Sequence, residues 1–570
     1  MPRTPTPADV AEKSCHNCRR RRLKCDRGLP SCAKCAWTGQ ECLGYGKLFL
    51  WNRGVASRGK MMGKDFPRPK HELRMRSREP AYGAVQPRPE ASLVDPIFGD
   101  MDYALRGYLF HFANNVSADM VISSAQGGNP FCSLIPLAQE HPVLLHAIVA
   151  NAALHTSCLH QRSSGTLDLL SDYSADCLSR SQSDPINLAT NSKIDALTSK
   201  HTALALLRSS LENIQRTNTG GNSNDSASEN DIGVDVELDL IITVIHLLIT
   251  FDLIDMGESE WRAHVQGAIR LISYLQTLEH KKRRDRRSTR QSPLASIRDA
   301  ITSDCLTYYI LGSTLMTTHT LDDPFHLSTT TGNDINASLI RAEANSYLSL
   351  PTPLLQILFK ACELSNLVSV ASTTDASDSD YTSTYTSVTT TAQSLLQQVQ
   401  SFDVIPWAEN LESCSPERQT SRIHTALAHR AAVQIYIIRS VDGLPSPACV
   451  SLSDSRASDA QILNQGTENL VSTIISHLSQ ISSSDPMFKA TCWPTFIAGA
   501  ETDDPVYREW ALQRLREFWW LIPWGYIRTA VEVMRTSWGI RDSFAERGGG
   551  FAARGWVQGL KALERGWLIP

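Results

Sequence analysis

The sequence contains none of the short motifs that mark the common enzyme classes. There is no G-x-S-x-G nucleophile turn, no H-E-x-x-H metal-binding helix and no dinucleotide-binding glycine motif. The segment GVASRGKM at 54–61 matches the pattern of a phosphate-binding loop up to its last position. There, Met61 replaces the Ser or Thr that would ligate magnesium. We therefore expect a protein that is not an enzyme and that has a basic linker at this segment.

Long hydrophobic runs are also absent. The longest, LIITVIHLLITF at 240–251, is too short to cross a bilayer and contains His246, which favours a buried core helix. The first residues, MPRTPTPADVAEK, have no apolar segment of the kind that directs secretion. We therefore expect a reducing compartment and no membrane partner.

Charge is distributed unevenly along the chain. The 570 residues carry a net charge of -4, yet residues 13–78 contain 18 Lys and Arg against four acidic residues. That segment is therefore +14, and the remainder of the chain is -18. A cationic segment of this density attracts polyanions, of which nucleic acid and anionic membranes are the main candidates.

Six of the 14 cysteines fall in one short segment, where the pattern C-x2-C-x6-C occurs twice: Cys15, Cys18, Cys25, Cys32, Cys35 and Cys42. Two tetrahedral zinc ions need eight coordination positions, and six thiolates supply eight only when two of them bridge both ions. The repeat requires the bridging pair to be equivalent in both halves, which allows Cys15 with Cys32, Cys18 with Cys35, or Cys25 with Cys42. Reduced thiols without metal, or a purely structural zinc site, are the alternatives.

The segment RRRRLKCDRGLPSC resembles the fungal Zn(2)-C6 binuclear cluster DNA-binding domain, in which a basic run follows the first cysteines and a proline precedes the fourth. Pro30 holds that place here. In the family the first and fourth cysteines bridge two zinc ions, so the resemblance implies that Cys15 and Cys32 bridge. It also implies that Cys18 and Cys25 complete one ion, and Cys35 and Cys42 the other.

The basic residues between Cys18 and Cys25 are suited to binding nucleic acid. The residues between Cys15 and Cys25 include no Gly or Pro, so they favour a short helix that zinc ligands would clamp at both ends. A planar guanidinium can bind the O6 and N7 acceptors of guanine together. The resemblance implies that Arg21 and Arg22 read a CGG-type triplet in the major groove. We assign the remaining basic residues to phosphates: Arg19, Arg20, Lys24 and Arg27.

The basic run also fits a nuclear localisation signal or a solvated charged surface, and neither excludes DNA binding. A second basic run, KKRRDRR at 281–287, is predicted to be an exposed loop.

Apolar residues recur at helical spacing through most of the chain beyond residue 95, and no alternating strand pattern competes with them. Two polar inserts, near 218–231 and 372–391, interrupt the helices. The segments NPFCSLIPLA, WRAHVQGAIRLI and CWPTFIAGAETDD resemble the regulatory region of fungal-specific transcription factors. Four histidines on helical patterns are predicted to lie in the core or in grooves instead of binding metal: His146, His155, His246 and His264.

These patterns predict a small zinc binuclear cluster domain at 10–50, built from two short helix-plus-extended halves. A disordered basic linker at 51–95 and an all-helical regulatory domain with disordered loops at 96–570 are expected to follow.

The predicted function is that of a nuclear, sequence-specific RNA polymerase II transcription regulator. Double-stranded DNA with GC-rich triplets is the main expected partner, with a homodimer or second regulator and the transcription machinery as further ones. The rival hypothesis is an enzyme or small-molecule receptor whose basic segment only localises it.

Overall fold

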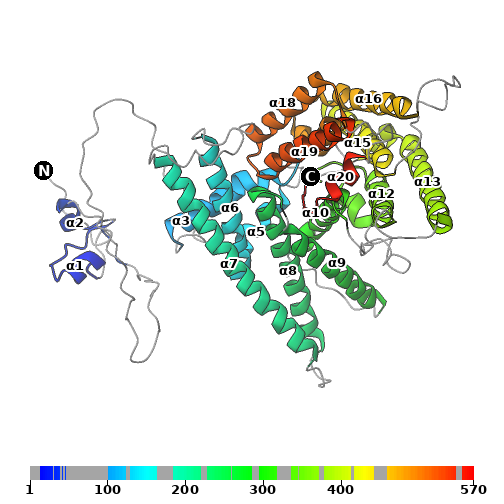
Figure 1. The fold of residues 1–570 in the computed structure, drawn as a ribbon. Coiled ribbons are helices and arrows are strands. Elements are labelled where there is room, and N and C mark those ends of the chain that lie inside the picture. The colour runs from blue at the N-terminus through cyan, green and yellow to red at the C-terminus, as the bar shows by residue number, and fades with distance from the viewer. Residues whose placement is uncertain are drawn as a thin grey trace. The chain divides into compact units, whose positions relative to one another are not determined.

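The computed structural model describes most of the chain in two compact units, Met1–Ser92 and Leu93–Pro570 (Figure 1). The described residues are 13–29, 31–38, 42, 45, 101–122, 129–163, 184–219, 227–258, 260–284, 294–317, 336–343, 346–371, 378–411, 416–441, 459–546 and 555–570. Pro30, the segment 54–61 and the predicted linker 51–95 lie outside them.

The N-terminal unit contains two short helices, α1 (His16–Arg20) and α2 (Ala33–Trp37), in the two halves of the cysteine repeat. The prediction of two short helical halves is therefore confirmed. The first helix is shorter than expected, because α1 ends at Arg20 and Arg21 is its C-cap residue. Arg22 follows with a positive φ of 53°, so the chain has already turned away from the helix axis there.

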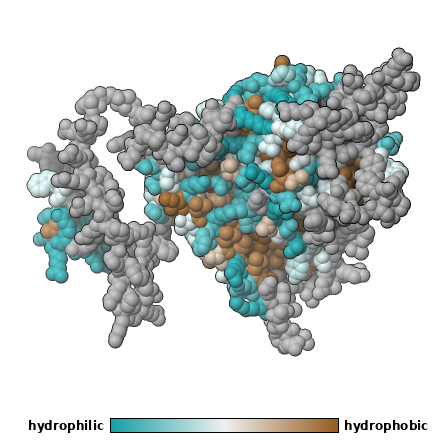
Figure 2. Space-filling model, in the orientation of Figure 1, coloured by the Kyte–Doolittle hydropathy of each residue, from teal (hydrophilic) through white to brown (hydrophobic). Residues whose placement is uncertain are grey.

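The described part of the second unit is helical and contains no strand, as predicted (Figure 1). One continuous hydrophobic core joins its helices, and the described residues on the face shown in Figure 2 are both hydrophilic and hydrophobic. Its first half comprises α3 (Tyr103–His111), η3 (Phe112–Val116), α4 (Ser117–Asp119), η4 (Pro130–Ser133), α5 (Leu134–Leu137), α6 (Pro142–Ser163), α7 (Asp184–Thr219), α8 (Ala227–Asp255), α9 (Trp261–Arg284) and α10 (Ala295–Thr314). Its second half comprises α12 (Thr352–Ala371), α13 (Asp378–Ser401), α14 (Val404–Asn410), α15 (Pro416–Ser440), α16 (Asp459–Leu478), η7 (Pro486–Thr491), α17 (Cys492–Glu501), α18 (Pro505–Leu521), α19 (Tyr526–Glu546) and α20 (Trp556–Lys561).

Two apolar helices form the centre of the first half. The run at 240–251 lies in α8 and is buried throughout, which confirms the predicted core helix. Helix α6 is also apolar and long enough, at Pro142–Arg162, to cross a membrane by length and composition, yet 72% of that window is buried inside the protein. Because α6 packs against α7 and α8, its apolar surface is part of the hydrophobic core.

Some boundaries differ from the predictions. The polar inserts are shorter than expected, because α8 begins at Ala227 and α13 at Asp378. Helix α9 continues to Arg284, so the first four residues of the second basic run are helical and do not form a loop. Residues 301–314 of α10 are buried on every side, so this part of the helix has no exposed face.

A buried ion pair and a hydrogen bond at Glu501, the last residue of α17, connect this helix to α15 and α20. Glu501 is 1% exposed, and Arg439 of α15 donates to both of its carboxylate oxygens, from Nε at 3.0 and 2.9 Å and from Nη2 at 2.5 Å. The indole N–H of Trp556, in α20, donates to Glu501 Oε2 at 2.9 Å. Burial opposes ionisation, but Arg439 outweighs it and lowers the pKa of Glu501.

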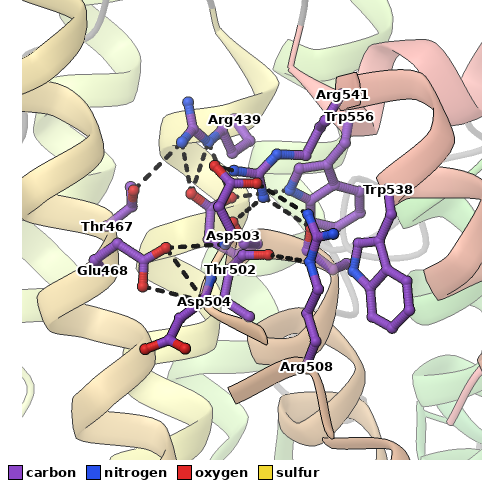
Figure 3. A network of polar contacts seen from close by, with 12 residues as sticks. Arg439, Thr467, Glu468, Thr502, Asp503, Asp504, Arg508, Trp538, Arg541 and Trp556 are labelled. Carbon is purple, nitrogen blue, oxygen red and sulfur yellow. Dashed lines mark hydrogen bonds and ion pairs between the residues drawn. The ribbon is translucent and has the colours of Figure 1, made fainter. Parts of the chain in front are cut away.

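The acidic turn that follows α17 extends this network to α18 and α19. Asp503 accepts from Arg508 at 3.0 Å and from Arg541 at 2.5 Å (Figure 3). Arg508 also lies over the ring of Trp538, 4.9 Å from its centroid. The segment CWPTFIAGAETDD therefore acts as a junction between helices, and Trp493 is fully buried within it.

Lys561, at the end of α20, is a buried cation with an amide partner. It is 1% exposed, and its Nζ donates to Oδ1 of Asn366 at 2.9 Å. Burial lowers its pKa from 10.5 to about 8. The unfolded chain therefore binds more protons between pH 8 and 10.5, so this group penalises folding fully below pH 8 and progressively less as the pH rises.

We expect Lys561→Met to stabilise the protein by roughly 2–3 kcal/mol at pH 7, and the gain to shrink as the pH rises toward 10. Urea unfolding of both proteins at pH 7 and 9.5 measures this. A gain that is equal at the two pH values would contradict the buried-charge explanation.

Candidate metal centre and nucleic-acid interface

The sulfur atoms of the cysteine repeat converge in the N-terminal unit. Cys15 Sγ lies 3.5 Å from Cys32 Sγ and 3.8 Å from Cys35 Sγ, and Cys18 Sγ lies 3.8 Å from Cys32 Sγ. The sulfurs of Cys15, Cys18, Cys32 and Cys35 all lie within 4.8 Å of one another. Tetrahedral zinc with Zn–S bonds of about 2.3 Å separates its sulfurs by about 3.8 Å, so the spacing fits shared zinc ligation.

The remaining two cysteines lie at the edges of this cluster. Cys25 Sγ accepts from the backbone N–H of Cys15 at 3.5 Å and lies within 4.8 Å of the Cys32 sulfur. Cys42 packs against the buried sulfurs and is partly exposed. The structure therefore brings all six predicted cysteines together.

The two halves hold their first cysteines in the same way. Cys15 is the N-cap of α1, and its sulfur accepts from the N–H of Cys18 at 3.4 Å. Cys32 is the N-cap of α2, and its sulfur accepts from the N–H of Cys35 at 3.3 Å. Both are fully buried. The sulfurs of Cys15 and Cys32 contact each other, and Cys18 and Cys35 each contact a cysteine of the opposite half as well.

Burial raises the pKa of four thiols: Cys15, Cys18, Cys32 and Cys35. At Cys25 burial acts in the same direction, but the backbone N–H groups of Cys15 and Arg27 outweigh it and lower the pKa to about 7. A zinc ion must displace the thiol protons in order to bind, so metal binding and folding of this unit are coupled.

Two residues besides the cysteines join the halves, and sequence reasoning missed the first of them. Asp26 accepts from the N–H of Ala33 at 2.9 Å and of Lys34 at 3.3 Å, so a carboxylate of the first half caps the helix of the second. These bonds, that from Ala33 foremost, lower the pKa of Asp26. Tyr45 packs against the cysteines and donates to the carbonyl of Gly28 at 2.5 Å. The signal for this cap that the sequence offered was an aspartate directly after Cys25.

The predicted DNA-binding residues surround the end of α1. Arg19 lies on α1, and the backbone of Arg20 ends it. The other basic side chains follow within the next seven residues, and those of Arg19, Arg21, Arg22, Lys24 and Arg27 are exposed. A compact set of cations therefore projects from the first half of the cluster.

Three of the four predicted histidines lie next to an acidic side chain. His155 Nε2 lies 3.3 Å from Asp119, and His246 Nε2 lies 3.1 Å from Asp304. His264 is 3.8 Å from Asp252, and burial lowers its pKa to about 4. Among the described residues, the only groups with metal-ligand spacing include cysteines of the repeat. The prediction of core histidines is confirmed for His155 and His246, which are 2% and 1% exposed.

A cysteine metal cluster beside exposed cations, followed by an all-helical unit, defines the class of zinc-cluster transcription regulators. The family described as the fungal specific transcription factor domain matches residues 107–567, and the fungal Zn(2)-Cys(6) binuclear cluster domain matches residues 13–51. The chain belongs to this family of fungal transcription factors, with a zinc cluster that holds two zinc ions.

The chain is similar to the acriflavine sensitivity control protein acr-2 of Neurospora crassa. The two are 29% identical over 654 aligned positions, which cover 98% of this chain and 97% of that protein. No solved structure matches.

Proposed function

We propose that this transcription regulator reads a CGG-type triplet in the major groove through Arg21 and Arg22. The observation that carries the proposal is the exposed basic turn that begins directly where α1 ends, at a helix whose N-cap Cys15 belongs to the sulfur cluster. Metal binding would hold this turn in one geometry, and the arginine fork matches the two acceptors of guanine. Arg19, Arg20, Lys24 and Arg27 would bind phosphates.

In the proposed cluster, Cys15 and Cys32 bridge the two zinc ions. Cys18 and Cys25 complete one ion, and Cys35 and Cys42 complete the other. The 3.5 Å contact between the sulfurs of Cys15 and Cys32 supports this assignment, because two sulfurs that bridge the same pair of ions must lie side by side. The contacts of Cys15 with Cys35 and of Cys18 with Cys32 fit this bridge and a bridge at Cys18 and Cys35 equally well.

Binding of the full-length protein to matched duplexes tests base reading. Arg22→Ala is expected to weaken binding to a CGG-containing duplex by about 1–3 kcal/mol, because the guanine contact is lost, with a much smaller effect on a scrambled duplex. Fluorescence anisotropy at fixed salt measures both affinities, and zinc content confirms that the cluster is intact. Equal losses on the two duplexes would leave Arg22 with no role in base reading.

One cluster contacts few base pairs, so useful discrimination in a nucleus requires a second half-site. We propose that a second copy or another DNA-bound regulator supplies it, and that the helical unit recruits transcription machinery. Unbiased selection of duplexes by the full-length protein would report half-site number and spacing. Selection of random sequences would favour the rival hypothesis, in which the basic segment only localises an enzyme or receptor.

The relative in Neurospora crassa is named for control of acriflavine sensitivity. We propose on this basis that the present chain regulates genes that determine tolerance to a toxic compound. Deletion of its gene, followed by growth on acriflavine, tests this, and unchanged sensitivity would contradict it.

A further inference from the structure

Two arginines of the N-terminal unit have left-handed backbone conformations. The backbone φ angle is 53° at Arg22 and 60° at Arg27. Among the described non-glycine residues of this unit, these two have a positive φ. The side chain of an L-residue crowds the backbone in this region, whereas glycine adopts it without steric cost. Residues held in such conformations often mark functional positions.

The backbone at each position has an evident structural purpose. The N–H of Arg22 donates to the carbonyl of Arg19 at 3.2 Å, and the N–H of Leu23 donates to that of Cys18 at 2.9 Å. Many helices end with this pair of hydrogen bonds. The residue in the position that Arg22 occupies here is then usually glycine. The N–H of Arg27 is hydrogen bonded to the sulfur of Cys25. The cluster therefore needs these two conformations, but neither requires an arginine.

The internal repeat shows which residue the other half has at these places. The second cysteine triplet follows the first by 17 positions, so Arg22 corresponds to residue 39 and Arg27 to residue 44. Both of those residues are glycines. Gly39 and Gly44 lie outside the described residues, so the comparison is one of sequence. The half without the basic run thus has glycine at both places, and the half with the basic run has arginine at both.

Both arginine side chains are exposed. A guanidinium at either place can bind a polyanion outside the domain. We propose that Arg22 and Arg27 are both DNA-contacting residues whose left-handed conformations cost the cluster stability, and that DNA binding offsets this cost. This inference rests on the proposed function, and it predicts that stability and DNA affinity move in opposite directions at these two positions.

The two arginines differ in what they contact. Arg22 follows the helix end and belongs to the pair assigned to guanine, so its loss weakens binding to CGG selectively. Arg27 lies beyond Cys25 and binds phosphate, so its loss weakens binding to every duplex and lowers the salt dependence. Glycine at both positions removes both contacts and both sources of strain.

The test compares Arg22→Gly and Arg27→Gly with the wild type in the full-length protein. Zinc release to a chromogenic chelator is expected to slow by about threefold to tenfold in each variant, because glycine removes the strain. Affinity for a CGG duplex is expected to fall about tenfold or more in Arg22→Gly. Arg21→Gly is the matched control, since Arg21 has φ -92° and glycine there should not slow zinc release. Arg22→Lys keeps the charge and the strain, so its zinc release should equal that of the wild type.

Two results would overturn the inference. Unchanged or faster zinc release in both glycine variants would show that the arginines cost no stability. Slower release together with undiminished DNA affinity would show that the side chains are not retained for DNA. A different outcome would contradict the proposed base reading alone: the glycine variants release zinc more slowly and bind DNA more weakly, but the wild type binds CGG and scrambled duplexes equally.

Discussion

Cys15→Ser and Cys32→Ser are each expected to abolish binding of both zinc ions and of DNA. Each sulfur is fully buried and lies within 3.8 Å of cysteines of the opposite half, so in the proposed cluster each is a ligand of both ions. Structural zinc contributes about 10–16 kcal/mol of apparent binding energy, and a unit this small has little other core. Zinc per chain, measured by atomic emission on the purified full-length variants, should fall from two to near zero.

Other cysteines provide the controls. Cys42→Ser is expected to spare the ion held by Cys18 and Cys25, so about one zinc ion should remain. Cys305→Ser, at a buried cysteine of α10, should leave both ions bound. Complete zinc loss in Cys18→Ser with partial loss in Cys15→Ser would place the bridge at Cys18 and Cys35 instead.

Arg439→Ala and Glu501→Ala are each expected to destabilise the helical unit by about 3–5 kcal/mol. Removing either partner leaves the other charge buried without compensation, and Glu501 is 1% exposed. Glu501→Ala also removes the acceptor of the indole N–H of Trp556, so α15 and α20 lose the partner that they share in α17. The midpoint of urea unfolding, followed by circular dichroism, measures the change.

The double variant Arg439→Met/Glu501→Met is the sharper comparison. Because it removes both charges together, it should recover most of the stability lost in either single variant. Arg208→Ala breaks an exposed pair with Glu212 on α7 and should cost less than about 0.5 kcal/mol. If the single variants of Arg439 and Glu501 lose as little stability as Arg208→Ala, the buried network adds little to the free energy of unfolding.

The metal centre could be predicted from the sequence because its ligands lie close together in the chain. Spacing placed all six cysteines within 28 residues, and coordination number required that two of them bridge. The same local reasoning predicted exposed cations next to Cys18. It did not predict where α1 ends, because that depends on the bonds from Arg22 and Leu23 back to the helix.

The helical unit was predictable in class but not in its internal contacts. Apolar residues at helical spacing identified the second unit as helical, whereas residues 301–314 of α10 are buried on every side and have no exposed face. His246 showed no acidic neighbour in sequence, because its partner Asp304 is 58 positions away. Glu501 and Arg439 are separated by 62 positions, and only their packing makes them partners.

The sequence by itself determined the six zinc-binding cysteines, the adjacent cations and the all-helical composition of the second unit. These properties follow from spacing and periodicity over a few turns, which short-range geometry controls. The tertiary structure alone decided that Asp26 caps the opposite half and that Arg22 and Arg27 are left-handed. It also decided that Glu501 joins three helices. Such features depend on which distant groups meet once the core is packed, because a buried charge or a strained residue persists only where its surroundings compensate for it.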